Sequence, residues 1–407
     1  MRWSLGGVAA PRALAAGAVV GLACAGLAAC TPAADGPPVA VLFPGGTDDD
    51  WGASAEVLRQ ELADDGYVVE VRFAGDDIPR QLEQLREVLA AKPAAVVLAP
   101  VDETAISAVL SDNTTAGVSI IAYDDLILNS DQVDYFASFD HRAAGRLQAR
   151  ALLDGLGLAD DPDAGPFAVE LLASSGDDRA AQDAFAGALE LLQPYLDAGR
   201  LTVPSGRTGL EQAAILRGDP AVAAERVAEL LDAGVPLAGV LSPSDAMSAA
   251  VAEVLAAEGV PVVAAGGGWT ASPVPPDGEP SDAPSTPPPP DASIPPNTDA
   301  GPDAASASAA SGSAASAADG LTPVVLTGGG STLDGARAVR EGTQSSTVYE
   351  DPRALARAVA NMVREVVGGG APTLTEGATT DNGIREVPTL LVEPQLVATI
   401  EDAVALL

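Results

Sequence analysis

Carboxylates and one indole ring are the side chains in this sequence that are best suited to chemistry. Asp50 and Trp51 lie in a polar loop after an apolar run, and Asp124 and Asp125 follow another. Carboxylates accept hydrogen bonds from hydroxyl groups, and an aromatic ring offers a flat apolar face. These residue types favour recognition of a small polar molecule. Two alternatives stay open: Trp51 as a capping side chain of its loop, and Asp124 as the N-cap of whatever follows.

The sequence offers little for catalysis or metal binding. His141 is the single histidine, so a Ser–His–Asp triad could use no other, and its sequence neighbours suggest no nucleophile. One His and two Cys leave too few ligands for a His/Cys zinc site. The acidic run at 48–50 lacks the ligand spacing of an EF-hand, and the glycine runs lack the Lys-Ser/Thr of a phosphate loop. We expect no enzyme activity, metal or cofactor. A glycosidase, which pairs two carboxylates across a cleft, is the contrasting class.

Charge and composition narrow the class of protein further. The 407 residues carry 21 Lys and Arg against 57 Asp and Glu, a formal net charge of −36. Such an acidic surface repels phosphate backbones, so we expect no nucleic-acid partner. Apolar residues make up 47% of the chain but aromatic residues only 3%, so the core must be built mainly from Ala, Val and Leu. The length suits two domains of ordinary size.

The amino terminus predicts export and a lipid anchor. Arg2 and Arg12 precede an apolar run at 13–26 that is too short for an ordinary transmembrane helix, and the run ends in Leu-Ala-Ala-Cys at 27–30. This ending resembles the lipobox of bacterial lipoproteins, which implies a signal peptide over 1–29, a lipidated Cys30 and a tether over 30–37. A plain secretory signal with an incidental cysteine is the alternative. We expect a body held outside the cytoplasmic membrane by its lipid only.

Apolar runs of four to eight residues alternate with helical patterns, and the alternation starts again after residue 140. Such alternation is typical of parallel sheets built from βαβ units, with ligands at the carboxyl ends of the strands. We therefore predict an α/β fold of two doubly wound parallel-sheet lobes. The expected strands of the two halves are 39–44, 67–73, 94–99, 118–123, 167–173, 201–203 and 237–241.

A change of composition interrupts the second half. Residues 270–319 are rich in Pro, Ser, Ala and Asp and have no periodic apolar face, which predicts a disordered insertion. Pro-Val-Val occurs on both sides of it, at 261–263 and 323–325, and we expect the later copy to take the strand position. The tail continues with strands and helices to the end of the chain. We assign 38–141 plus about 328–345 to the N-terminal lobe, and 142–268 plus about 321–327 and 346–395 to the C-terminal lobe.

Several segments resemble the type I periplasmic sugar-binding proteins, in particular the xylose and multiple-sugar branch that serves ABC importers. The similar segments are Asp-Asp-Ile-Pro-Arg-Gln-Leu at 76–82, Ile-Ala-Tyr-Asp at 121–124, Val-Asp-Tyr-Phe-Ala-Ser-Phe-Asp at 133–140, Leu-Ser-Pro-Ser-Asp at 241–245, and the tail stretches at 344–353 and 382–388. Their order and spacing together carry the resemblance. It implies two lobes joined by a three-crossover hinge that close around one small ligand, a monomeric binder, and an ABC permease as partner.

The resemblance also implies a set of ligand-binding positions, many with altered residues. An Arg-Trp pair of the family is Asp50-Trp51 here, an Asp-Arg pair is Asp124-Asp125, and a stacking Trp is replaced within Leu-Arg-Gly-Asp-Pro at 216–220. The family's Gly-Gln-Asp is a glycine triplet at 328–330. The implied ligand-binding residues are Asp50, Trp51, Asp124, Asp125, Asp178, Arg179, Arg217, Ser244, Asp245 and Gly330.

Some of these positions have a purely structural interpretation. Asp245 begins a predicted helix, where N-capping is expected and can coexist with ligand contact. In so acidic a chain, Arg179 and Arg217 are more often surface partners of nearby aspartates than ligand contacts. Two functions stay open: a binder of a small polar solute such as a sugar, or of a larger or cationic one, and a surface lipoprotein, a sensor or scaffold, with a degenerate pocket.

Overall fold

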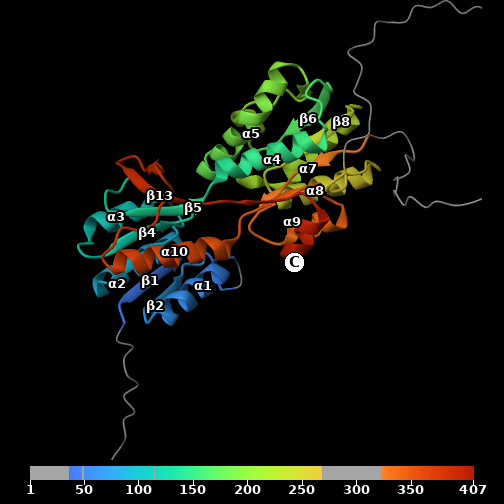
Figure 1. Cartoon of the computed structure of the whole chain (residues 1–407). Helices are drawn as coiled ribbons and strands as arrows, with labels where there is room; N and C mark the ends of the chain where they lie inside the picture. The colour runs from blue at the N-terminus through green and yellow to red at the C-terminus, as the bar shows by residue number, and fades with distance from the viewer. Residues whose placement is uncertain (1–35, 48–49, 114, 268–321) are drawn as a thin grey trace, which may run out of the picture. The chain divides into compact units, whose positions relative to one another are not determined.

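The computed structural model describes residues 36–47, 50–113, 115–267 and 322–407. The predicted signal peptide, Cys30 and the 270–319 insertion lie outside the described residues. Within them the chain forms two α/β lobes built on parallel sheets, and this confirms the predicted fold class (Figure 1). None of the described helices combines the length and apolarity needed to cross a membrane.

The N-terminal lobe (N-lobe) is built on a seven-stranded sheet of order β12-β13-β5-β4-β3-β1-β2. All neighbours are parallel except β12 and β13, which pair antiparallel. The central strands are continuous apolar runs because both faces of the sheet are covered. The bounds are β1 (Pro38–Phe43), β2 (Val68–Phe73), β3 (Ala95–Leu98), β4 (Ser119–Tyr123), β5 (Tyr135–Phe139), β12 (Thr379–Asp381) and β13 (Glu386–Val392).

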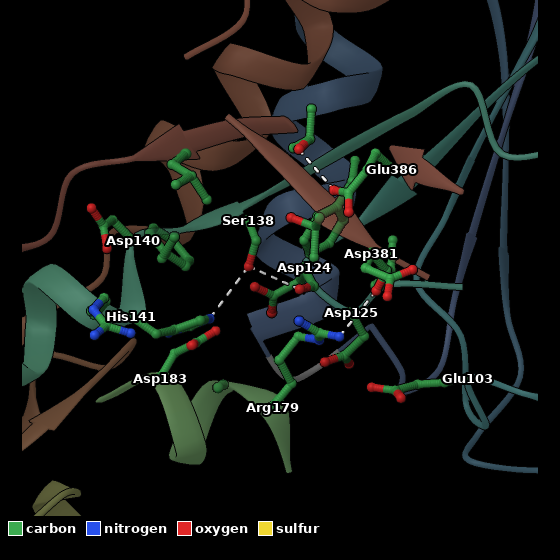
Figure 2. Close-up of a pocket in the computed structure, with 18 of the residues that line it drawn as sticks. Glu103, Asp124, Asp125, Ser138, Asp140, His141, Arg179, Asp183, Asp381 and Glu386 are labelled. Carbon is green, nitrogen blue, oxygen red and sulfur yellow. Dashed lines mark hydrogen bonds between the residues drawn. The ribbon is translucent and has the colours of Figure 1, made fainter. Parts of the chain in front are cut away.

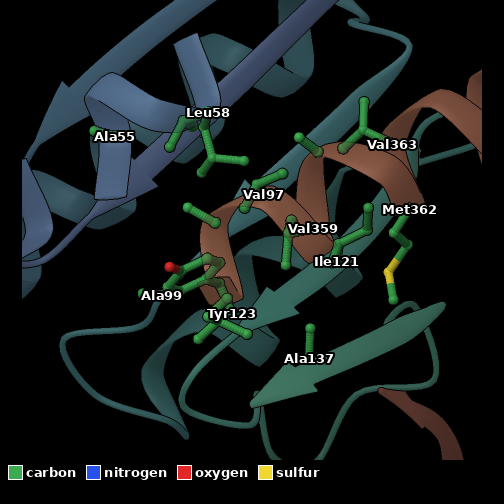
Figure 3. Packing of buried hydrophobic residues seen from close by; sticks show 14 of the residues in the cluster. Ala55, Leu58, Val97, Ala99, Ile121, Tyr123, Ala137, Val359, Met362 and Val363 are labelled. Atoms are coloured by element: carbon green, nitrogen blue, oxygen red, sulfur yellow. The ribbon is translucent and has the colours of Figure 1, made fainter. Parts of the chain in front are cut away.

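Alternate residues of each strand pack under different helices. Val39 and Val41 of β1 join the cluster under α1 (Asp50–Asp64) and α10 (Pro352–Val367). Ala40 and Leu42 join the opposite cluster, under α2 (Ile78–Ala91) and α3 (Ala105–Asp112). Figure 3 shows Leu58 of α1 and Val359 of α10 near Val97 and Ile121 of the sheet.

The C-terminal lobe (C-lobe) has a parallel sheet of order β7-β6-β8-β9 and a small sheet of order β10-β11-β14. One cluster packs the main sheet against α4 (His141–Gly155) and α5 (Arg179–Asp197), and another packs it against α7 (Pro220–Asp232) and α8 (Asp245–Ala257). The remaining elements are β6 (Phe167–Leu171), β7 (Leu201–Thr202), α6 (Leu210–Ala213), the 3-10 turn η1 (Leu216–Gly218), β8 (Leu237–Leu241), β9 (Val325–Leu326), β10 (Gly329–Gly330), α9 (Asp334–Glu341), β11 (Thr347–Tyr349), β14 (Gln395–Val397) and α11 (Ile400–Leu406).

The structure corrects the predicted division of the tail. Residues 328–345, predicted in the N-lobe, lie in the C-lobe, where β10 pairs with β11 and α9 contacts α11. Of the stretch 346–395, predicted in the C-lobe, α10 packs on α1 and β13 pairs with β5 in the N-lobe. Local patterns did not reveal this, because α10 and β13 are buried by partners more than 200 residues away. The chain therefore passes between the lobes at 139–141, 349–352 and 392–395.

The two Pro-Val-Val copies lie side by side. The later copy supplies β9, which pairs with β8, as predicted. The earlier copy does not compete for that position, since Val262 forms a parallel bridge with Val324 at the outer edge. Both copies are therefore used by the C-lobe sheet.

Candidate ligand-binding cleft

A cavity of about 520 Å³ lies beside the crossover at 139–141 and is lined by both lobes (Figure 2). We call it the hinge cavity. Its walls come from the carboxyl ends of β4 and β5, the amino ends of α4 and α5, and the β12–β13 hairpin. The polar lining residues are Glu103, Asp124, Asp125, Ser138, Asp140, His141, Arg142, Arg146, Arg179, Asp183, Thr379, Thr380, Asp381 and Glu386.

Asp124 and Asp125 follow β4 directly. Asp124 adopts a left-handed backbone conformation with φ 65°, and the Asp124 amide donates to the carbonyl of Ala137 at 2.7 Å. No described helix begins there, so Asp124 is not an N-cap. Burial raises the pKa of Asp124 to about 6 and that of Asp125 to about 7, and the second is raised further by the charges of Asp124 and Glu103. Both carboxyls therefore titrate near neutrality.

His141, which was not predicted as a site residue from the sequence, lines the hinge cavity. Its Nδ1 is 2.9 Å from Oε1 of Glu350, which lies on the second crossover, and its Nε2 is 3.3 Å from Oγ of Ser138. Burial alone would lower the pKa of His141, but the bond to Glu350 and the surrounding carboxylates raise it to about 9. The imidazole is therefore a cation at neutral pH.

The contacts of Ser138, His141 and Glu350 do not activate a nucleophile. The Ser138 hydroxyl has one proton, which it donates to the backbone carbonyl of Asp124 at 2.8 Å. The protonated His141 must then donate from Nε2 to Ser138 and cannot accept a proton from it. The three residues instead connect the first crossover to the second.

The cavity arginines are held by the protein itself. Arg142 donates from Nε to Glu190 at 2.6 Å, and Arg146 reaches the same carboxylate at 3.3 Å. Arg179 donates from Nη2 to the backbone carbonyl of Asp381 at 3.0 Å, which joins α5 of the C-lobe to the β12–β13 hairpin of the N-lobe.

A smaller cavity of about 150 Å³, the C-lobe pocket, adjoins the hinge cavity and shares His141 and Ala180 with it. Gly330 and Asp178 line it at the carboxyl side of the C-lobe sheet. Asp178 also caps α5, since its Oδ1 accepts from the Ala180 amide at 2.8 Å. The cleft therefore has one wall from each lobe and His141 between them.

Ser244 and Asp245 serve the C-lobe itself. Ser244 is the N-cap of α8 and accepts from the Met247 amide at 3.3 Å. Asp245 accepts from Gln344 Nε2 at 2.8 Å and from Thr347 Oγ1 at 2.7 Å, and burial raises its pKa. The helix cap is thus Ser244 and not Asp245. A Cβ at Gly328 would lie only 2.4 Å from the Asp245 carboxylate and closer still to Gln344 Nε2, so a larger residue there would displace this hydrogen-bonded pair.

The periplasmic binding protein domain model matches residues 39–273. This chain belongs to the periplasmic binding protein family. The chain is 32% identical over 365 residues to the multiple sugar-binding periplasmic receptor ChvE of Rhizobium radiobacter, covering 89% of this chain and 87% of that protein. It is also 32% identical over 367 residues to the multiple sugar-binding periplasmic protein SbpA of Azospirillum brasilense, covering 89% and 86%.

A solved structure gives the same result. An ABC transporter solute-binding protein from Clostridium phytofermentans with bound β-D-glucose superposes with a TM-score of 0.66 at 25% identity, covering 91% of this chain and 96% of that one. The resemblance to the type I periplasmic sugar-binding proteins is thereby confirmed.

Within this periplasmic binding protein, the predicted ligand residues fall into separate groups. The hinge cavity brings together Asp124, Asp125 and Arg179, and the C-lobe pocket holds Asp178 and Gly330. The other five line neither of these cavities: Asp50, Trp51, Arg217, Ser244 and Asp245.

Three of those five have contacts of their own. Asp50 accepts from Ser331 Oγ of the C-lobe at 2.7 Å. The ring of Trp51 lies 5.2 Å from that of Phe43 and packs on the N-lobe core. Arg217 is exposed, has a left-handed backbone with φ 57°, and donates from its backbone amide to Ser175 Oγ at 2.9 Å. Their ligand roles stay predictions.

The cavity-lining residues of the C-terminal tail were not predicted from the sequence. Asp381 and Glu386 line the cavity only because β13 pairs with β5. Asp183 lines the cavity because it lies just over one turn from the start of α5, and Glu103 lines it because it lies in the loop after β3. His141 had one usable signal, its position at the crossover where the alternation of strands and helices starts again.

Proposed function

We propose that this chain is a lipid-anchored, extracytoplasmic solute-binding protein that captures a small polar ligand, a sugar, for an ABC importer. The observation that carries the proposal is the cleft at the carboxyl ends of the strands of both lobes, beside the crossovers, in a chain whose relatives are named multiple sugar-binding proteins. The chain acts as a monomeric binder and not as an enzyme.

Binding works through closure of the lobes. Asp124 and Asp125 accept hydrogen bonds from ligand hydroxyls on the N-lobe side, and the residues around Gly330 complete the site from the C-lobe side. A ligand that contacts both lobes only when they are closed stabilises the closed form, which an ABC permease then recognises. A lipid on Cys30 keeps the binder close to that permease and raises its effective concentration there.

A thermal-shift screen of the full chain against neutral sugars, polyols, amino sugars and amino acids tests the binding function. A ligand at 100 times its dissociation constant stabilises the folded state by about 2.7 kcal/mol, so a true ligand gives a clear rise in Tm. A folded protein that shows no rise across the sugar and polyol panels would favour the surface lipoprotein with a degenerate pocket.

The anchor has its own test. The wild-type chain, expressed in its bacterial host, partitions into the detergent phase on Triton X-114 extraction, and Cys30→Ser moves it to the aqueous phase. Cys24→Ser is the matched control, because that cysteine lies within the predicted signal peptide. A Cys30→Ser chain that stays in the detergent phase would contradict lipidation at Cys30.

A further inference from the structure

The charges that line the hinge cavity do not balance. Seven carboxylates line it against three arginines and one histidine. In a confined site such an excess of one sign is unfavourable, because like charges repel strongly where water is scarce. The partners of the cations decide how much of this excess remains.

The cations are largely occupied by groups other than the carboxylates at the centre of the cavity. Arg142 and Arg146 share Glu190, and His141 is bonded to Glu350; neither Glu190 nor Glu350 lines the hinge cavity. Arg146 also lies 3.7 Å from the carboxylate of Asp140, which does line the cavity at its edge beside α4. Arg179 is bound to a backbone carbonyl, and its charge acts on Glu103. A surplus of negative charge is therefore left around the start of the loop after β4.

Little compensates the charge of the Asp125 carboxylate. Among the described residues, none donates a hydrogen bond to its carboxylate or forms an ion pair with it, whereas Asp124 is close to the Ser138 hydroxyl. The charged groups that act on Asp125 are Asp124, Glu103 and Asp178, which disfavour its ionised form, and His141, which favours it. Burial and these three carboxylates raise its pKa to about 7.

We propose that the ligand of this cleft carries a cationic nitrogen beside its hydroxyl groups, as in an amino sugar or an aminated polyol, and that Asp125 receives that cation. This inference rests on the proposed function. The family and the cavity locate the binding cleft, and the acidic lining indicates only which class of ligand binds there. An ammonium group would form charge-assisted hydrogen bonds with Asp125, and Glu103 and Asp124 would add to the attraction.

Three matched pairs of probes test this: D-glucosamine with D-glucose, D-galactosamine with D-galactose, and N-methyl-D-glucamine with D-sorbitol. Each pair is titrated calorimetrically into the full chain at pH 6.5, where the amines are protonated. We expect at least one amine to bind about tenfold or more tightly than its neutral partner, because charge-assisted bonds are roughly twice as strong as neutral ones.

Asp125→Asn should remove most of this preference, because the amide still accepts a hydrogen bond from a ligand hydroxyl but no longer attracts a cation, so the amine should lose much more affinity than its neutral partner. Asp232→Asn is the matched control, since Asp232 is exposed on α7 and lines neither cavity. The fold of each variant is checked by its Tm. Binding of the amine should also release protons near pH 7, because a cation favours the ionised form of Asp125. Titrations in buffers of different ionisation enthalpy measure this release.

The outcomes separate the inference from the proposed function. Neutral sugars that bind the folded protein as tightly as their amines, or a preference that survives in Asp125→Asn, overturn the inference and leave the solute-binding function intact. A folded protein that binds no sugar, polyol or amine of the screen overturns the proposed function, and the inference with it.

Discussion

The carboxylates of the two lobes differ in what holds them. In the C-lobe, Asp178 caps a helix and Asp245 accepts two side-chain hydrogen bonds from its own lobe. In the N-lobe, Asp124 and Asp125 follow a strand with no helix to cap, and Asp125 has no hydrogen-bond partner among the described residues. Aspartates that follow parallel strands therefore have hydrogen-bond partners of their own in the C-lobe, whereas Asp125 in the N-lobe has none among the described residues.

The largest expected effect on stability comes from removing the Asp245 carboxylate in the C-lobe. Asp245→Ala leaves the Thr347 hydroxyl and one Gln344 amide bond without their acceptor in a buried site. We expect a loss of about 2–4 kcal/mol in the free energy of unfolding, because unpaired buried donors are costly. Urea unfolding followed by circular dichroism measures it. A loss below about 0.5 kcal/mol would show that Asp245 does not hold the C-lobe together.

Removing the charge of Asp125 in the N-lobe should have the opposite effect and raise the stability of the fold. The pKa of Asp125 is raised from 3.8 to about 7, so the folded state binds its proton more readily than the unfolded state does. Between about pH 4 and pH 7 this group makes stability fall as the pH rises. Asp125→Asn removes that cost, and we expect a gain of about 1–2 kcal/mol at pH 8 that vanishes at pH 4.

Urea unfolding of both proteins across this pH range measures the gain, and Asp232→Asn should show no such pH dependence. A loss of stability in Asp125→Asn at pH 8 would mean that its carboxylate has a structural partner after all.

The His141–Glu350 bond between the first two crossovers should have a smaller effect. The pKa of His141 is raised from 6.5 to about 9, so the pair stabilises the fold fully below about pH 6.5, and this contribution is lost as the pH rises through 9. Glu350→Gln should cost about 1 kcal/mol at pH 6 and almost nothing at pH 10. Because His141 is the only histidine, its imidazole NMR signals report its pKa directly, and that pKa should fall in the variant.

A difference between Glu350→Gln and wild type that stays constant from pH 6 to pH 10 would contradict this account. So would an unchanged His141 pKa in the variant.

The contact between Ser331 and Asp50 should matter least. It is a single hydrogen bond from the C-lobe to the N-lobe at 2.7 Å. Ser331→Ala should change the free energy of unfolding by less than about 0.5 kcal/mol and ligand affinity by less than about threefold. Urea unfolding and calorimetric titration measure the two quantities. A tenfold change in affinity would place this contact among the interactions that control closure.

The sequence predicted what local patterns encode. Most strands and helices from 38 to 258 follow from apolar runs and helical spacing, but β5 was not among the expected strands. The tail could not be divided correctly, because nothing near Leu390 or Val359 indicates that their partners are β5 and α1. Pairing across such separations is decided by the packing of the whole sheet.

The candidate site, like the fold, could be predicted only where the signal lies near the residue in the sequence. The position of Asp124 and Asp125 after a strand is a local signal, and both line the hinge cavity, although the family resemblance was needed to favour a ligand role that stays a prediction. His141 was not recognised, because its role depends on Glu350, which lies 209 residues away. The structural character of Asp245 likewise depends on Gln344 and Thr347, about 100 residues further along the chain.

The most direct test of the account compares Asp125→Asn with Asp245→Ala in both affinity and stability. D-Glucosamine is titrated into each folded variant by calorimetry at pH 6.5, and the free energy of unfolding is measured in the same buffer. The account predicts that Asp125→Asn weakens binding about tenfold or more without loss of stability, and that Asp245→Ala loses stability while its folded fraction binds almost normally. Unchanged affinity in Asp125→Asn together with lost binding in folded Asp245→Ala would contradict it.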